Sequence, residues 1–186
     1  GWFGFNAGSV LVADGVAGMA MVVTHISAAT ASIVWMCIEW VKHGKPSLVG
    51  IVTGMVAGLA TITPGAGFVG PAGALVFGFV AAFVCYWCVG FIKQKVNIDD
   101  SLDVFAVHGV GGALGILMTS FFGAEALGGL GLGEGMTMSS QLGAQALGLV
   151  VVAVWSLVIS WIIVKLIQKT IGLRVHEEDE IEGLDI

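Results

Sequence analysis

Two histidines lie inside long apolar runs, where an ionisable side chain is costly and therefore marks a candidate functional residue. His108 falls in the run 101–122, beside several glycines, and His25 falls in the run 15–41, beside hydroxyl side chains. A neutral imidazole donates a hydrogen bond from one ring nitrogen and accepts one at the other, so it can pass a small solute or a proton along a dry path. The alternative for His108 is a ring satisfied by a nearby carbonyl group, with no pathway beside it.

A second group of candidate residues stands near the start of the chain, where we expect a helix to emerge from the membrane. It consists of Trp2, Phe5 and Ser9. Aromatic faces attract cations by roughly 0.5 to 2 kcal/mol, and a hydroxyl oxygen can accept a hydrogen bond from a protonated solute. The alternative is an interfacial aromatic belt that binds no ligand. These residues alone leave both interpretations open.

The cysteines do not indicate a metal site. Cys85 and Cys88 have the spacing of zinc ligands, but they lie in an apolar run without a second ligand pair. Together with Cys37 they make an odd number, which argues against a disulfide framework. We therefore expect all three to be small buried apolar residues, and we expect no metal and no cofactor.

The overall composition excludes a soluble enzyme. Hydrophobic residues make up 57% of the 186 residues, charged residues only 11%, and the mean hydropathy is +0.99. A soluble domain carries about 25% charged residues and needs them to stay dissolved. Seven basic against 13 acidic residues give a net charge of −6, without a basic stripe, so nucleic acid is excluded as a partner. The partner that this composition indicates is a lipid bilayer.

The apolar runs have the length of membrane-spanning helices, each of which needs roughly 20 apolar residues. We expect an all-α, polytopic membrane helical bundle with five full spans and the end of a sixth at 1–11. The chain begins without Met, and we expect it to be the interior of a longer protein. The predicted full spans are 15–41, 47–63, 71–92, 101–122 and 139–166.

The basic residues predict how these spans are oriented. All seven lie at alternate ends of the runs, and the loops between the other ends contain none. The positive-inside rule then places the basic ends and the C-terminus in the cytoplasm. We expect a transmembrane domain over 1–171 and a cytoplasmic tail over 172–186. The basic residues are Lys42, Lys45, Lys93, Lys95, Lys165, Lys169 and Arg174.

Two further patterns indicate local structure. Gly50, Gly54 and Gly58 form a ridge of small residues, which is typical of closely packed membrane helices. Three carboxylates lie at the cytoplasmic start of the His108 helix, where they would cap free backbone N–H groups and favour the positive end of the helix dipole. These carboxylates are Asp99, Asp100 and Asp103.

Several short motifs together resemble the ammonium transporter (Amt/Mep/Rh) family, specifically its Amt branch. The matching segments are 1–9, 44–47, 63–65, 103–112, 172–174 and 182–185, so the resemblance covers essentially the whole chain. It implies an eleven-helix subunit with two inverted five-helix repeats, assembled as a homotrimer in the cell membrane with one pore per subunit. This chain would be the second repeat plus the last helix, and would contribute one wall of the pore.

The resemblance also implies roles for particular pore residues. His108 would be the second of two paired pore histidines, and Trp2 would line the pore. Phe5 would be one of two stacked phenylalanines at the outer gate, Ser9 part of the ammonium recruitment site, and Val104 part of the inner wall. No role for His25 follows from the family.

The resemblance extends to the tail, which in the family takes part in gating under a neighbouring subunit. The matching tail residues are Arg174, Glu182, Gly183 and Asp185. It further implies a PII-class signal protein as a partner at the cytoplasmic mouth, although His176 stands where many members have Pro.

The function implied is ammonium transport rather than catalysis. Ammonium would be recruited at the outer aromatic site and deprotonated, and ammonia would cross a hydrophobic pore past His108. The main alternative is an ammonium sensor of the same fold that signals through its tail. A proton-translocating subunit would need an acidic or Lys residue in mid-span, and Asp14 and Glu39 lie at span ends. A Rh-type relative shares the fold and stays open.

Overall fold

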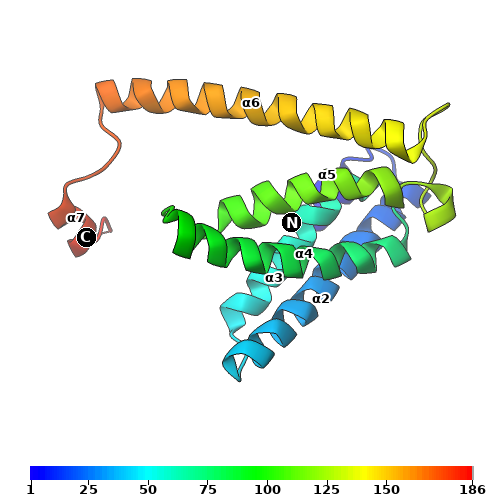
Figure 1. Ribbon diagram of the computed structural model, residues 1–186, viewed down its shortest axis with the longest axis horizontal. Helices are drawn as coiled ribbons and strands as arrows, with labels where there is room; N and C mark the ends of the chain where they lie inside the picture. The colour runs from blue at the N-terminus through cyan, green and yellow to red at the C-terminus, as the bar shows by residue number, and fades with distance from the viewer. Residues whose placement is uncertain (186) are drawn as a thin grey trace. The chain divides into compact units, whose positions relative to one another are not determined.

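The computed structural model describes residues 1–185, and this range contains helices and connecting loops but no strand (Figure 1). The elements are α1 (Trp2–Gly8), α2 (Gly15–His43), α3 (Leu48–Ile62), η1 (Thr63–Gly65), α4 (Pro71–Phe91), η2 (Ile92–Val96), η3 (Phe105–Val110), α5 (Gly111–Phe122), η4 (Glu125–Leu127), α6 (Met138–Thr170) and α7 (Glu177–Glu182). The all-α fold expected from the apolar runs is confirmed.

Within residues 1–185, five helical stretches are long and apolar enough to cross a membrane, as the runs predicted. They are Gly15–His43, Leu48–Gly65, Pro71–Val96, Phe105–Phe122 and Met138–Thr170. The predicted sixth segment, at 1–11, contains the short helix α1.

The fourth span begins at Phe105 rather than at 101, and its preceding loop explains the difference. The Asp100 carboxylate accepts hydrogen bonds from the backbone N–H groups of Val104, at 2.9 Å, and Phe105, at 2.8 Å. Asp103 has a backbone φ of 56°, which interrupts a helix at that residue. Its carboxylate pairs with Lys93 Nζ at 2.7 Å. The capping prediction is therefore confirmed for Asp100 and wrong for Asp103.

The chain forms two compact units, Gly1–Ala146 and Leu147–Ile186. The first contains α1 to α5 and the beginning of α6. The second contains the remainder of α6 and the short helix α7, which is joined to the preceding loop by an Arg174 Nη2 to Glu180 Oε1 ion pair of 3.0 Å. The pore residues predicted from the sequence all lie in the first unit.

The ends of α2 and the start of α3 are specified by local side chains. Asp14 Oδ1 caps α2 by accepting from the N–H groups of Val16 and Ala17. Gly44 ends the helix with a φ of 75°, a left-handed conformation that favours glycine. Ser47 then caps α3, and Glu39 of α2 accepts hydrogen bonds from the Ser47 backbone and hydroxyl. This carboxylate thereby joins the two helices where the chain reverses.

Helices α2, α3 and α4 pack closely because glycines remove side-chain bulk at their crossings. A Cβ atom on Gly54 would lie 2.5 Å from Trp35 Cβ, and one on Gly58 would lie 2.5 Å from the Ser27 carbonyl oxygen. A Cβ on Gly50 would overlap the Glu39 carboxylate. The glycine ridge of α3 thus lies against α2, and two buried apolar clusters surround these crossings.

The cysteines are not all buried. Cys85 is buried in the cluster with Trp35, but Cys37 is exposed and Cys88 is half-buried. The prediction that all three are buried is therefore wrong for Cys37. Cys37 follows the buried Trp35 by two residues, about 200° around the helix, and so points away from the packed side of α2.

Candidate functional site

Helix α1 brings Trp2 against the only histidine of the fourth span. The Trp2 and His108 rings stack, with centroids 5.9 Å apart and planes inclined by 20°. The indole Nε1 of Trp2 donates a hydrogen bond of 2.8 Å to Thr63 Oγ1, at the end of α3. Thr63 in turn donates to the carbonyl of Leu59 at 2.7 Å. The hydrogen bond to Thr63 therefore orients the Trp2 ring, whose face stacks on the His108 imidazole.

His108 itself lies in a stretch of π-helix, η3, between Phe105 and Val110. Such wide turns inside helices are rare and frequently occur at functional sites. The residue is exposed in the first unit, and so is Val104, with 51% of its surface accessible. Thus Trp2 stacks against the His108 ring, and the histidine retains exposed surface.

Phe5 lies in the middle of α1, and Ser9 directly follows the end of this helix. The Phe5 ring meets Trp2 edge-on at a centroid distance of 6.1 Å and is 62% exposed. The Ser9 hydroxyl donates to the Phe5 carbonyl at 2.5 Å. Its oxygen keeps lone pairs that can accept a hydrogen bond from a cation.

A buried polar contact fixes α1 to α2. Asn6 is 7% exposed, and its Nδ2 donates to Thr24 Oγ1 at 2.9 Å, while the Thr24 hydroxyl donates to the Ala20 carbonyl. Breaking one partner of such a buried pair leaves the other unsatisfied at a cost of about 1 to 3 kcal/mol. This contact keeps Trp2, on the same short helix, in register with Thr63 and His108.

His25 belongs to a different contact. Its ring lies 5.9 Å from that of Phe3, with planes inclined by 43°, and the residue is exposed. Phe3 follows Trp2 in α1, so the two side chains leave the helix about 100° apart. The structure therefore does not bring His25 into the stack of Trp2 and His108.

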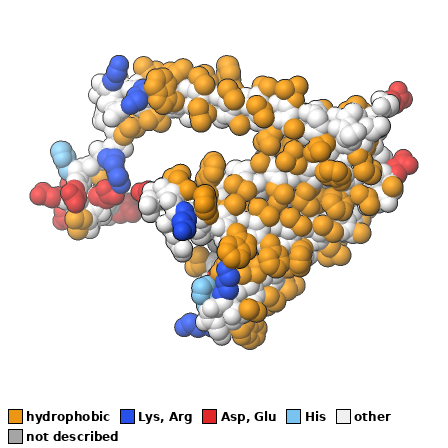
Figure 2. All heavy atoms as spheres, in the orientation of Figure 1, with side chains coloured by type: hydrophobic (Ala, Val, Ile, Leu, Met, Phe, Trp, Pro, Cys, Tyr) orange, Lys and Arg blue, Asp and Glu red, His pale blue; other side chains and the backbone are white. Residues whose placement is uncertain are grey.

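Much of the surface around these residues is apolar. In each of the five spans, at most 44% of the most apolar stretch of 18 residues is buried inside the protein. Figure 2 shows hydrophobic side chains over the visible face of α4 and α5. An exposed apolar surface of this extent is typical of a membrane or protein interface.

The tail residues lie in the second unit. Glu182 is the last residue of α7, and Gly183 follows it with a φ of 100°, which favours glycine. Asp185 is exposed, and Arg174 pairs with Glu180 of α7. The ion pair gives the tail a short ordered turn.

Two features of the site were missed by sequence reasoning. Thr63 was noted only as part of a family motif, and the sequence did not show that its hydroxyl would accept a hydrogen bond from Trp2. The π-helical turn at His108 was also missed, although the glycines that follow it were a signal of irregular helix. A hydroxyl residue directly before Pro64, at the end of an apolar run, is the pattern that could have indicated Thr63.

Comparison with known proteins identifies the family. The family model described as Ammonium Transporter Family matches residues 1–186. The ammonium transporter Amt1 of Archaeoglobus fulgidus is 46% identical over 193 residues, covering 100% of this chain and 47% of the relative. The chain thus spans less than half the length of the curated relatives it matches.

Solved structures show the same fold. A protein described as a Sensor Amt Protein matches with a TM-score of 0.91 and 32% identity, over 100% of this chain and 45% of its own. Mep2 of Candida albicans matches with a TM-score of 0.84 and 36% identity, over 96% of this chain and 41% of its own. The five apolar helices within residues 1–185, together with the match to the family model, indicate a multi-pass membrane protein. The chain belongs to the Ammonium Transporter Family.

Proposed function

We propose that this protein carries ammonium nitrogen across a membrane by conducting ammonia past His108. The observation that supports the proposal most is the stack of Trp2 on His108, with the indole held by Thr63. The arrangement combines an oriented imidazole with an aromatic and apolar surround. Such surroundings disfavour a charge and still offer hydrogen bonds to a neutral solute.

The physical reason for deprotonation is selectivity. Ammonium and potassium have similar size and charge, so a wet cationic pore would separate them poorly. An apolar constriction makes a retained charge expensive, and ammonium can release its proton and continue as neutral ammonia. Potassium has no such route.

Each site residue has a place in this proposal. Ammonium is collected at the outer side by the aromatic faces of Trp2 and Phe5 and by the Ser9 oxygen. It is deprotonated there, and the proton moves separately or is relayed by the histidines, while ammonia passes His108 and then the inner wall near Val104. A second imidazole, from a segment outside residues 1–186, completes the histidine pair.

The assembly is also part of the proposal. We propose a homotrimer in the cell membrane, with residues 1–171 as the transmembrane part and 172–186 as a cytoplasmic tail. Arg174, Glu182, Gly183 and Asp185 belong to the regulatory tail, whose ion pair with α7 supports a folded rather than extended segment. A PII-class signal protein at the cytoplasmic mouth is the partner proposed from the family.

The sensor alternative is not favoured. The curated relatives are named ammonium transporters, and similarity in fold to a sensor does not separate sensing from transport.

Replacing His108 with Ala tests the proposal. Methylammonium uptake should fall, or potassium exclusion should weaken, in cells that express the complete protein. His43→Ala is the matched control, because His43 is exposed and lies outside the stack. Unchanged uptake together with unchanged potassium exclusion in the His108→Ala protein would refute the role given to this residue.

A further inference from the structure

The proposed function leaves out His25, the second histidine that lies inside a membrane span. An ionisable side chain at this depth is costly unless it faces a cavity or a partner. The His25 ring lies 5.9 Å from the Phe3 ring of α1, with the two planes inclined by 43°. Within residues 1–185 the His25 side chain forms no hydrogen bond and no ion pair. Phe3 is therefore the partner that the structure gives this ring.

His25 follows Thr24, and these two residues of α2 contact α1 at two points. Thr24 Oγ1 accepts a hydrogen bond of 2.9 Å from the buried Asn6 side chain. Phe3 precedes Asn6 by three residues, which is about one turn of a helix. Helix α2 thus contacts α1 once in its second half, through Thr24, and once near its beginning, through His25.

One contact alone does not fix how a short helix is rotated about its own axis. Helix α1 has only seven residues, and α2 is the helix against which it packs most extensively. Side chains reach about 5 Å from a helix axis, so a rotation of about 20° moves a ring by about 2 Å. Because Trp2 directly precedes Phe3, a rotation that separates Phe3 from His25 also displaces the Trp2 ring.

The hydrogen bond to Thr63 does not by itself prevent this displacement. It fixes one atom of the indole, Nε1, and leaves the ring free to tilt about that atom. The remaining orientation of the ring depends on the backbone of α1. The stack of Trp2 on His108 has a centroid distance of 5.9 Å, and a misplacement of about 1 Å in a functional site can lower a rate by about 100-fold.

We propose that His25 is a positioning residue, which acts through Phe3 on α1 and keeps the Trp2 ring against His108. A pair of rings of this kind favours contact over separation by a factor of about 2 to 12. Removing the pair should therefore lower methylammonium uptake by about twofold to tenfold. This effect on uptake rests on the proposed function, but the position of Trp2 can be measured without transport.

The first measurement follows the Trp2 ring directly. The complete protein is labelled with fluorotryptophan and purified in detergent, and the fluorine NMR resonance of Trp2 is the one that Trp2→Phe removes. His25→Ala should shift or broaden this resonance, because the indole moves relative to the His108 ring. His25→Phe keeps a ring opposite Phe3, so it should retain the original resonance and the original uptake.

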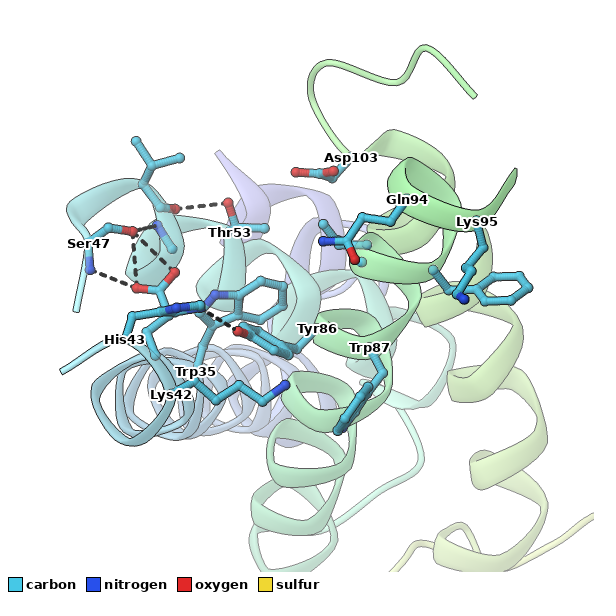
Figure 3. A pocket seen from close by; sticks show the side chains of 16 residues that line it. Trp35, Lys42, His43, Ser47, Thr53, Tyr86, Trp87, Gln94, Lys95 and Asp103 are labelled. Carbon is cyan, nitrogen blue, oxygen red and sulfur yellow. Dashed lines mark hydrogen bonds between the residues drawn. The ribbon is translucent and has the colours of Figure 1, made fainter. Parts of the chain in front are cut away.

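His43→Ala is the matched control, because His43 is the other histidine of α2. It lies about 27 Å from His25 along the helix, in the wall of a cavity that Trp35 also lines (Figure 3). Its Nε2 atom lies 3.0 Å from the Tyr86 hydroxyl oxygen. His43→Ala should change neither the Trp2 resonance nor methylammonium uptake.

Phe3→Leu tests the same contact from α1, and it keeps the proposal testable if His25→Ala does not fold. Phe3 is 41% exposed, so this change leaves no cavity in the core. It should displace the Trp2 resonance and lower uptake as His25→Ala does. The protein with both substitutions should be no more impaired than either single variant, because each of them removes the same contact.

Three results would overturn the proposal. An unchanged Trp2 resonance in the His25→Ala protein would show that His25 does not position Trp2. A His25→Phe protein that resembles His25→Ala in resonance and uptake would assign the role to the imidazole nitrogens. Additive effects of Phe3→Leu and His25→Ala would show that the two residues act separately. A displaced resonance with unchanged uptake would support the positioning role and count against the role of Trp2 in the proposed function.

Discussion

Gly58→Ala should destabilise the protein by forcing apart the crossing of α2 and α3. A Cβ atom at this position would lie 2.5 Å from the Ser27 carbonyl oxygen and 2.7 Å from Ala31 Cβ. Favourable separations are about 3.5 to 4.0 Å, so the helices must move apart locally by about 1 Å. The obstacle is α2 backbone, which cannot turn aside as a flexible side chain can.

The magnitude follows from three terms. Overpacking of this kind costs about 1 to 3 kcal/mol. The movement also stretches the 2.8 Å hydrogen bond from Ser27 Oγ to the Gly58 carbonyl, whose loss costs about 0.5 to 1.5 kcal/mol. Alanine's better helix propensity returns about 0.5 to 1 kcal/mol. The expected net loss in the free energy of unfolding is about 0.5 to 4 kcal/mol, centred at about 2 kcal/mol.

The assay is reversible unfolding of the complete purified protein in detergent, with Gly18→Ala as the matched control. Gly18 lies in α2, and a Cβ there would meet nothing within 4 Å. Ser27→Ala isolates the hydrogen-bond term and should cost about 0.5 to 1.5 kcal/mol. If Gly58→Ala were as stable as Gly18→Ala, the close approach of the two backbones would not be present in the membrane protein.

Two further predictions concern the site and the helix that carries it. Thr63→Val removes the acceptor for Trp2 Nε1 and should lower methylammonium uptake at equal expression; Thr170→Val, which also loses a hydroxyl bonded to its own helix, should leave uptake unchanged, and equal uptake in both would contradict the prediction. Asp100→Ala should lower the free energy of unfolding by about 0.5 to 2 kcal/mol, because two backbone N–H groups lose their acceptor. Asp100→Asn should retain most of that stability in the same unfolding assay, and a loss equal to that of the Ala variant would argue against capping.

The spans were predictable because the membrane imposes one simple requirement on each of them. A helix that satisfies its own backbone and carries roughly 20 apolar residues is recognisable without knowledge of its neighbours. The start of the fourth span was less predictable. Asp100 and Asp103 look alike in sequence, and only the position of Lys93 decides which one is used for an ion pair.

The chemistry of the site was predictable only in part. Placing an ionisable imidazole inside a membrane span costs free energy, so His108 was recognisable from the sequence as a candidate functional residue. Its partners did not, because Trp2 and Thr63 are 106 and 45 positions away in the chain, counted from their residue numbers. His25 shows the limit of the same argument, since it has the same cost and yet contacts Phe3 instead.

By itself the sequence determined the helical class, the number of spans and the residues worth examining, because these depend on composition and local hydrogen bonding. Tertiary structure alone decided that Trp2 covers His108, that Thr63 holds the indole, and that Trp35 lines a cavity without an acceptor for its N–H. Those relations join helices far apart in the chain. The glycine pattern at Gly54 and Gly58 predicted a close helix contact, but only the tertiary structure showed that α2 is the helix that lies against it.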